Sequence, residues 1–486
     1  MSQIAVTARA GAPEDTAADT RVVGLFEDET LPDPALQALV ERGEARPGLR
    51  KVAVAHEDAP GGGPRPVLLA GLGKRDELDP ERARVAAAAV ARRARELGAG
   101  SLSWALPAEG VEVGLVEGTI LALYEFDRFK SKQDDDDDDD AGKLESLEIA
   151  GTGVVEKSVR RGAVAADAAN RARDLQNLPS NVATPTFLAE RAAEVAAAHG
   201  SVELETLDRE QIAARGMGAF VAVAQGTYEE PCLIVLRYSG GGSGPHLGFV
   251  GKAVTFDTGG ISLKPGAKMS EMKFDMSGGA AVLESIDAIA TLGVPATITA
   301  IIPATENMPS GRSVKPGDIV TAMNGKTIEV NNTDAEGRLI LADALCYAVE
   351  QGVERIVDLA TLTGAIIVAL GSTHAGLFSN DDDWCAEVDA ACTATGELGW
   401  RLPLHREYAE LVKGKYADLD NAPGVRKASS ITAAEFLHSF VGEVPWVHID
   451  IAGTAWDLSR PYSGKGASGF AVRSLIELAR RSAGAS

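Results

Sequence analysis

Residues 246–264, with the sequence HLGFVGKAVTFDTGGISLK, decide the fold of the second half of this chain. The segment His246–Val250 is a short apolar run followed by a glycine, which is typical of a buried β-strand. Further on, Asp257 precedes Gly259 and Gly260, which let the backbone turn sharply or approach a ligand closely. Active sites of open α/β sheets collect at the carboxyl ends of strands. The stretch therefore predicts an α/β fold with a functional site at this edge of the sheet.

An alternation of apolar runs and helical segments extends over the whole chain and predicts a largely parallel sheet in its first third. We expect further strands at Arg21–Phe26, Lys51–Ala55, Pro66–Gly71, Cys232–Tyr238, Thr297–Ile302, Arg355–Ala360 and Trp446–Ile451. We expect helices at Arg82–Leu97, Val111–Phe129, Val155–Leu175, Gly278–Leu292, Gly337–Glu350, Thr432–Phe440 and Gly469–Arg481.

A β-hairpin is the clearest local feature. Two β-like runs, 318–323 and 326–330, flank the pair Asn324 and Gly325. An Asn-Gly pair supplies the two positive-φ positions that a type I′ turn requires. We therefore expect a two-residue type I′ hairpin here.

The composition is that of an acidic globular protein. The 486 residues include 47 Lys and Arg against 70 Asp and Glu, which gives a net charge of −23. Nucleic acids and anionic membranes are bound through clustered positive charge, so this balance argues against both classes of partner. Seven acids form the run Asp134–Asp140. Like charges this dense repel one another, which favours a solvated insertion over a cation site.

Other features indicate the compartment. The four cysteines form no CxxC motif, so we expect no disulfide framework. The N-terminal residues lack the basic and apolar segments of a signal peptide, and no run reaches the ~20 apolar residues that span a bilayer. Together these features predict a soluble protein of a reducing cytoplasm.

Two carboxylates in the segment 332–339, NTDAEGRL, are the second chemical feature. Asp334 and Glu336 are two residues apart, so in an extended backbone their side chains share one face and converge. Anionic oxygens of this kind bind divalent cations, and paired cations need bridging carboxylates. The residues alone leave alternatives open, because acids here also cap helices or form surface pairs, and Asp257 also suits a turn. They predict a carboxylate-rich site and no more.

Three longer segments resemble the leucyl (cytosol) aminopeptidase family of di-metal exopeptidases. They are GKAVTFDTGGISLKP at 251–265, EMKFDMSGG at 271–279 and NTDAEGRLILADAL at 332–345. The resemblance covers residues 170–470, whereas the N-terminal third is similar only in outline. NTDAEGRL is the signature of that family and is far more specific than a glycine-rich loop.

The resemblance implies an α/β fold in two domains. Residues 1–165 would form a smaller N-terminal α/β (macro-like) domain for oligomerisation or regulation, ending in a connecting helix. Residues 166–486 would form a larger catalytic domain, a three-layer α/β/α fold with a mixed sheet. Two departures from the family pattern are Ala253, where relatives commonly have glycine, and the segment 427–429, which replaces a more glycine-rich approach to a helix.

The resemblance also implies two divalent metal ions per subunit, with zinc or manganese expected. One ion would be held by Asp257, Asp334 (through its carboxylate and main-chain carbonyl) and Glu336. The other would be held by Lys252, Asp257, Asp275 and Glu336, so that Asp257 and Glu336 bridge. Lysine binds a cation only as the neutral amine, and two adjacent dications oppose formation of the ammonium.

Roles for three further residues follow from the same resemblance. Lys264 would stabilise the oxyanion of the tetrahedral intermediate. Arg338 would hold a bicarbonate ion that acts as general base, and Met272 would line the specificity pocket. No histidine lies in the segments 251–275 and 332–339, and we assign His448 and Asp450 structural roles.

The implied activity is release of unblocked N-terminal residues, leucine or other apolar residues by preference, because the free α-amine of a peptide would bind one metal. The resemblance further implies a cytoplasmic homo-hexamer that acts on peptides, with no nucleic-acid or membrane partner. The alternative function is a moonlighting DNA-binding regulator, which the net charge disfavours. A phosphoesterase-like di-metal site is disfavoured because such sites usually recruit histidine.

Overall fold

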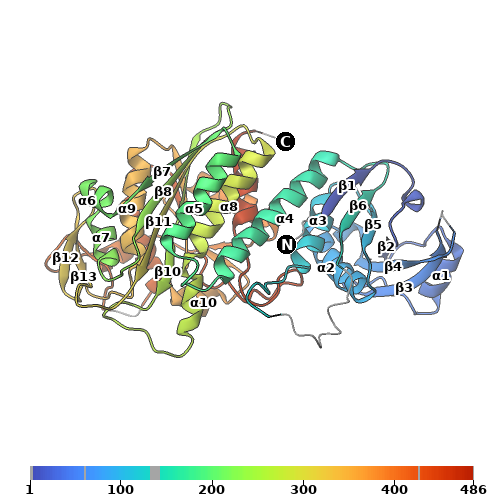
Figure 1. Cartoon of the computed structure of the whole chain (residues 1–486), viewed down its shortest axis with the longest axis horizontal. Coiled ribbons are helices and arrows are strands. Elements are labelled where there is room, and N and C mark those ends of the chain that lie inside the picture. The colour runs from blue at the N-terminus through green and yellow to red at the C-terminus, as the bar shows by residue number, and fades with distance from the viewer. Residues whose placement is uncertain (1–3, 60–61, 132–142, 425–426, 485–486) are drawn as a thin grey trace. The chain divides into compact units, whose positions relative to one another are not determined.

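The computed structural model describes residues 4–59, 62–131, 143–424 and 427–484. The chain folds into two compact units (Figure 1). They comprise Met1–Asn170 with Ser459–Gly464, and Arg171–Leu458 with Lys465–Ser486. The predicted α/β architecture with two domains is confirmed. The run Asp134–Asp140 lies outside the described residues, and the functional boundary placed after residue 165 stays a prediction.

The first unit is built on a six-stranded sheet with strand order β1-β6-β5-β2-β4-β3. The strands are β1 (Ala5–Arg9), β2 (Thr20–Phe26), β3 (Val52–Asp58), β4 (Pro64–Gly73), β5 (Ser101–Ala105) and β6 (Ser146–Ala150). The helices are α1 (Pro34–Glu41), α2 (Pro80–Glu96), α3 (Glu112–Ala122) and the first part of α4 (Glu156–Asn177). All neighbouring strands are parallel except β3 and β4. The prediction of a largely parallel sheet is confirmed.

Helices α2 and α3 pack so closely that two positions of α3 must be glycine. A Cβ atom on Gly114 would lie 2.1 Å from the carbonyl oxygen of Pro80. A Cβ atom on Gly118 would lie 2.2 Å from the carbonyl oxygen of Arg84. Because these neighbours are backbone atoms, any side chain at either position would force the two helices apart.

The predicted helix Val111–Phe129 is wrong in its second half, because α3 ends at Ala122. Beyond that residue the chain buries no continuous apolar face, and Phe129 is 57% exposed. Most of the stability of a helix in a protein comes from packing of its apolar face, so the helix stops where that packing stops.

The second unit is built on a nine-stranded mixed sheet with strand order β16-β15-β18-β14-β9-β11-β8-β7, and β10 pairs with β11 beyond the end of β9. The strands are β7 (Val202–Leu207), β8 (Cys232–Ser239), β9 (His246–Gly251), β10 (Ala253–Asp257), β11 (Thr297–Asn307), β14 (Arg355–Ala360), β15 (Ala375–Ser379), β16 (Gly399–Arg401) and β18 (Trp446–Asp450). Strand β11 continues to Asn307, beyond the predicted end at Ile302, and includes Pro303, which pairs with Leu233 of β8.

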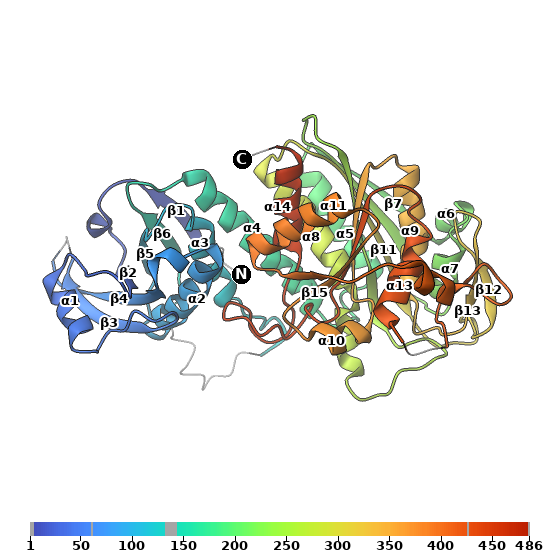
Figure 2. The ribbon, with the colours of Figure 1, turned by 180° about the vertical axis from the view of Figure 1, so that it is seen from behind.

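Helices cover both faces of this sheet, as the predicted three-layer arrangement requires (Figures 1 and 2). One layer contains α5 (Pro185–Ala198), α8 (Ser277–Leu292), α11 (Asp382–Thr395) and α14 (Val472–Ser482). The other contains α7 (Gly218–Ala224), α9 (Gly337–Glu350) and α13 (Ser429–His438). In the part of the chain that the structure describes, no helix has the length and apolar character needed to cross a membrane.

A separate three-stranded sheet contains the predicted hairpin. Its strands are β12 (Asp318–Thr321), β13 (Thr327–Val330) and β17 (Leu419–Asp420). Strands β12 and β13 are antiparallel, whereas the distant β17 joins β13 in parallel. The hairpin is therefore confirmed, and β17 is an addition that the sequence pattern did not predict.

The turn of this hairpin is not the predicted type I′ turn. The N–H of Gly325 donates to the carbonyl oxygen of Ala322 over 2.8 Å, and Gly325 has φ 84°. Asn324 is not among the described non-glycine residues with positive φ. These features fit a three-residue loop, in which a type I turn is followed by a left-handed glycine. Asp343 of α9 accepts a hydrogen bond from the N–H of Met323 over 2.7 Å, so a tertiary contact holds the loop in this form.

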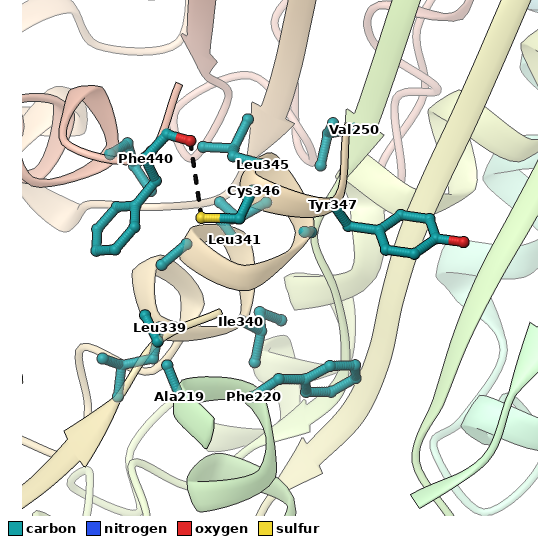
Figure 3. Close-up of a cluster of buried hydrophobic side chains, with 14 of the residues drawn as sticks. Ala219, Phe220, Val250, Leu339, Ile340, Leu341, Leu345, Cys346, Tyr347 and Phe440 are labelled. Atoms are coloured by element: carbon teal, nitrogen blue, oxygen red, sulfur yellow. Dashed lines mark hydrogen bonds between the residues drawn. The ribbon is translucent and has the colours of Figure 1, made fainter. Parts of the chain in front are cut away.

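Helix α9 is buried along almost its whole length. Figure 3 shows its side chains among those of α7, of β9 and of Phe440, whose carbonyl oxygen accepts a 3.8 Å hydrogen bond from Cys346 Sγ. The apolar residues of the helix in this cluster include Leu339, Ile340, Leu341, Leu345 and Tyr347. Because α9 begins directly after Glu336, this packing fixes the position of the segment 332–336.

Asp343 joins α9 to two other elements and provides a test of this packing. Its carboxylate accepts hydrogen bonds from the N–H groups of Phe220 in α7, over 2.8 Å, and of Met323. Asp343→Ala would leave both donors without this acceptor, so we expect a loss of about 2–4 kcal/mol in the free energy of unfolding. The control is Asp381→Ala, which removes the single cap bond to Trp384 N at the start of α11. Urea titration followed by tryptophan fluorescence gives the free energy of unfolding of each variant. An equal loss of this free energy in the two variants would contradict the role of Asp343.

Candidate metal centre

The predicted site residues lie on segments that meet at the carboxyl edge of the large sheet. Lys252 lies between β9 and β10, and Asp257 ends β10. Asp275 lies on the short 3₁₀ helix η4 (Met269–Met276), and Asp334 and Glu336 precede α9. Strand ends at this edge of an open α/β sheet face a common crevice.

Lys252 is the centre of one half of the cluster. Its Nζ lies 2.8 Å from Asp275 Oδ2, 2.8 Å from Glu336 Oε1 and 3.2 Å from the carbonyl oxygen of Thr361. Burial by itself lowers the pKa of this amine, but the charges of Asp275, Glu336 and Asp257 outweigh it and raise the pKa above its ordinary value. Lys252 is therefore a buried ammonium held by carboxylates.

Lys264 is the centre of the other half. Its Nζ lies 2.7 Å from Asp257 Oδ2 and also contacts Asp334 Oδ1. Carboxylate oxygens of Asp257, Asp334 and Glu336 all lie within 4.8 Å of one another. Burial lowers the pKa of Lys264, and Asp257, Glu336 and Asp334 together raise it further than burial lowers it. The two halves are adjacent, and two lysines face four carboxylates.

The electrostatics of the carboxylates reflect this crowding. Burial, and then the neighbouring charge of Glu336, raise the pKa of Asp257 to about 6, against the opposing effect of Lys264 and Lys252. Burial also raises the pKa of Asp275 well above its ordinary value. Burial by itself would also raise the pKa of Glu336, but the charges of Lys252 and Lys264 outweigh burial and lower this pKa. A concentration of buried negative charge that two lysines do not neutralise is suited to cations.

The donor atoms fit divalent metal ions. Glu336 Oε2 is buried, and among the described residues it accepts no hydrogen bond. Asp257 Oδ1, by contrast, already accepts hydrogen bonds from Gly259 N over 2.9 Å and Asn307 Nδ2 over 2.8 Å, which fix the orientation of the carboxylate. Oriented carboxylate oxygens with unused lone pairs are the ligands that hard and borderline dications prefer.

Glycine keeps the site compact at two positions. A Cβ atom on Gly337 would lie 2.6 Å from Lys252 Nζ, so a side chain there would displace the amine. Gly259 has φ 87°, and a Cβ atom on it would lie 2.7 Å from Asp334 Oδ1. Both glycines belong to the two motifs and are explained by the close approach of the backbone to the site residues.

Arg338 and Met272 lie beside the cluster rather than within it. Arg338 Nη1 donates to the carbonyl oxygen of Asn421 over 2.6 Å, and its buried Nε has no partner among the described residues. Burial lowers the pKa of Arg338 to about 10, although Glu336, Asp450 and Asp420 act in the opposite direction. Met272 lies on η4, half-buried, three residues before Asp275.

The sequence did not predict several residues that orient the cluster. Thr361 Oγ1 donates to Asp275 Oδ1 over 2.7 Å, and Asn307 Nδ2 donates both to Asp257 and, over 3.0 Å, to the carbonyl oxygen of Thr333. Thr361 directly follows the predicted strand at 355–360, so its position at the end of a strand could have identified it as a site residue. Asn307 lies in the part of β11 beyond Pro303. The strand predicted here ended at Ile302, so Asn307 was not expected to lie at the sheet edge.

His448 and Asp450 contact no predicted metal ligand directly. His448 Nδ1 lies 2.6 Å from Asp358 Oδ1 inside the sheet. Asp450 Oδ2 accepts a 2.6 Å hydrogen bond from Thr363 Oγ1, and its Oδ1 accepts one of 3.2 Å from Leu362 N. Asp450 therefore anchors the loop that follows β14.

Comparison with known proteins identifies the family of this chain. The cytosol aminopeptidase family is matched through its catalytic domain over residues 170–476 and through its N-terminal domain over residues 22–133. A "Probable cytosol aminopeptidase" from Roseiflexus castenholzii is 44% identical over 487 residues, which cover 98% of this chain and 99% of the relative. Another "Probable cytosol aminopeptidase", from Solibacter usitatus, is 45% identical over 470 residues, which cover 95% of this chain and 96% of the relative.

The fold is shared with solved structures. Two structures of the bottromycin maturation enzyme BotP, one of them in complex with Mn, align with a TM-score of 0.84 at 34% sequence identity. In each case the alignment covers 96% of this chain and 99% of the solved chain. The match of both domains, and relatives of this identity over nearly the whole length, show that the chain belongs to the cytosol aminopeptidase family.

Proposed function

We propose that this aminopeptidase releases unblocked N-terminal residues from peptides, with preference for leucine and other apolar residues, through water activated by two metal ions. The observation that carries the proposal is the cluster of Lys252, Lys264 and four carboxylates at the sheet edge. Asp257 contacts Lys264 and Glu336 contacts Lys252, and the charge of the other lysine also acts on each of these carboxylates. A pair of dications requires an excess of buried carboxylates, and in this proposal two of the carboxylates would each bind both ions.

The proposed ligand sets are those that the family resemblance implies, and the proximity of these side chains supports them. Asp257, Asp334 and Glu336 would hold one ion, and Lys252, Asp257, Asp275 and Glu336 would hold the other. We propose zinc or manganese, and one BotP structure is described as a complex with Mn. Two such ions supply an activated water at neutral pH and polarise the scissile carbonyl.

The chain's own residues then have separate tasks. Lys252 loses its proton when it acts as a ligand, since only the free amine has a lone pair. Lys264, whose Nζ contacts Asp257 and Asp334, would as an ammonium donate to the oxyanion that forms at the substrate carbonyl. Arg338 would hold bicarbonate as general base, with its buried Nε free of protein partners among the described residues. Met272, on η4, would line the pocket for the N-terminal side chain.

We also propose a cytoplasmic homo-hexamer, with the first unit taking part in assembly. Sedimentation velocity on the full chain tests the assembly directly. The expected result is one species of six chains, and a stable species of 50.6 kDa would contradict it.

Substrate selectivity tests the proposed function. Leucyl-anilide is expected to be hydrolysed, and N-acetyl-leucyl-anilide is not, because acetylation removes the amine that would bind a metal. Aspartyl-anilide and lysyl-anilide are expected to react more slowly than leucyl-anilide. Initial rates at equal substrate concentration, with Mn²⁺ or Zn²⁺ present, provide the measurement. Equal rates on the free and acetylated leucyl substrates would contradict the proposal.

Three substitutions separate metal binding from catalysis. Glu336→Ala is expected to lower both metal content and activity, because Glu336 would contact both ions. Lys264→Ala is expected to keep the metal and to lose about 10²–10³ in kcat, as for loss of an oxyanion donor. Arg338→Ala is expected to keep the metal and to lose the response of the rate to added bicarbonate. Elemental analysis measures the metal content of each variant. Steady-state kinetics measure its kcat and the response of its rate to bicarbonate.

The control for these variants is Lys268→Ala, since this side chain of the same loop is 80% exposed and pairs only weakly with Glu271, at 3.6 Å. Its metal content and kcat are expected to equal those of the unmodified enzyme. Full activity of Lys264→Ala, or an unchanged bicarbonate response of Arg338→Ala, would show that the assigned roles are wrong.

A further inference from the structure

Asn421 is a fully buried polar residue that lies outside the segments carrying the proposed metal ligands. It follows β17, which runs parallel to β13, and its N–H donates to the carbonyl oxygen of Glu329 over 3.0 Å. Strand β13 ends at Val330, and the chain then leaves the sheet toward Asp334 and Glu336. Asn421 therefore lies at the point where the segment 331–336 begins.

The side-chain amide of Asn421 binds this segment at both of its polar atoms. Its Oδ1 accepts hydrogen bonds from the N–H groups of Asn331 over 2.9 Å and Asn332 over 3.2 Å. Its Nδ2 donates to the carbonyl oxygens of Asn332 over 2.7 Å and Ala335 over 3.3 Å. The amide thus takes the place of a neighbouring strand for a segment that has left the sheet, since it supplies a donor and an acceptor as a peptide group does.

The residues that Asn421 binds surround the proposed ligands. Ala335 lies between Asp334 and Glu336, and its carbonyl oxygen is one of the two that Nδ2 binds. The main-chain carbonyl oxygen of Asn421 also accepts the 2.6 Å hydrogen bond from Arg338. One buried residue is therefore bonded both to the backbone between two carboxylates and to the guanidinium of the following turn.

We propose that Asn421 is a positioning residue for the metal centre: its amide holds the backbone of residues 331–335 so that Asp334 and Glu336 converge. The inference rests on the proposed two-metal function. Partners that orient metal ligands typically change metal affinity or activity by 10–100-fold when they are removed. The side chain of Asn421 touches neither substrate nor metal in this proposal, so it acts only through the residues it binds.

Two variants test the proposal on the full chain. Asn421→Ala removes all four side-chain hydrogen bonds. Asn421→Asp has nearly the same shape and keeps the acceptor for Asn331 and Asn332, but it places an oxygen against the carbonyl groups of Asn332 and Ala335. We expect both variants to bind Mn²⁺ about 10–100-fold more weakly in calorimetric titrations of metal-free protein. We also expect kcat on leucyl-anilide to stay below that of the unmodified enzyme when Mn²⁺ is saturating.

The matched control is Asn380→Ala. The amide of Asn380 also bonds to backbone at both ends, donating to the carbonyl oxygen of Val444 over 3.0 Å and accepting from Trp446 N over 2.8 Å. Neither of these partners belongs to the segments that carry the proposed ligands. We expect Asn380→Ala to change the unfolding temperature but not the Mn²⁺ affinity.

The outcomes separate this inference from the proposed function. Unmodified Mn²⁺ affinity in either Asn421 variant, or an equal loss of affinity in Asn380→Ala, would overturn the positioning role. Failure of both Asn421 variants to fold, judged by circular dichroism beside a folded Asn380→Ala, would assign Asn421 a purely structural role and also overturn it. Binding of fewer than two Mn²⁺ ions by the unmodified chain would instead contradict the two-metal function itself.

Discussion

The pairing of the buried Lys252 with Asp275 and Glu336 is the interaction on which the second unit depends. Lys252 is 2% exposed, and an unpaired ammonium at that depth would cost several kcal/mol. The end of β9, the helix η4 and the start of α9 must therefore reach one point, each with its own residue. The same constraint explains Gly337, because a side chain there would overlap the amine of Lys252.

The surrounding fold holds the segment that carries Asp334 and Glu336 in a fixed position, and the charged residues of the cluster make the site suited to cations. Apolar packing of α9 fixes the end of the segment that carries Asp334 and Glu336, and the hydrogen bonds of Asn421 fix its start. Burial raises the pKa of Asp257, and repulsion from Glu336 raises it further, to about 6, because carboxylates held in this way cannot move apart. The strain between like charges makes the site favourable for cations, and it links the geometry to the metal-dependent activity of the family.

Much of this could be predicted from the sequence, because the signals were local. Apolar runs located β2, β3, β4, β8, β9, β11, β14 and β18 but not β1, β5, β6, β7, β10, β15 or β16, and α9 and β14 have the predicted ends. The residues alone predicted only a carboxylate-rich site, and the cluster residues could be named because they lie in the segments that resemble the cytosol aminopeptidase family. The turn type of the hairpin could not be predicted, since Asp343 from a distant helix bonds to the loop. Asn421 could not be found for the same reason: nothing near it in the sequence shows that β17 joins β13 and brings it beside residues 331–335.

The central claim is that the carboxylates and lysines at the sheet edge form a site for two metal ions. Anomalous diffraction from crystals grown with Zn²⁺, with data collected above and below the zinc absorption edge, tests it most directly. The predicted result is two anomalous peaks per chain, one among Asp257, Asp334 and Glu336 and the other beside Lys252 and Asp275. Crystals with Zn²⁺ bound elsewhere, or with no peak within ligand distance of these side chains, would contradict the claim.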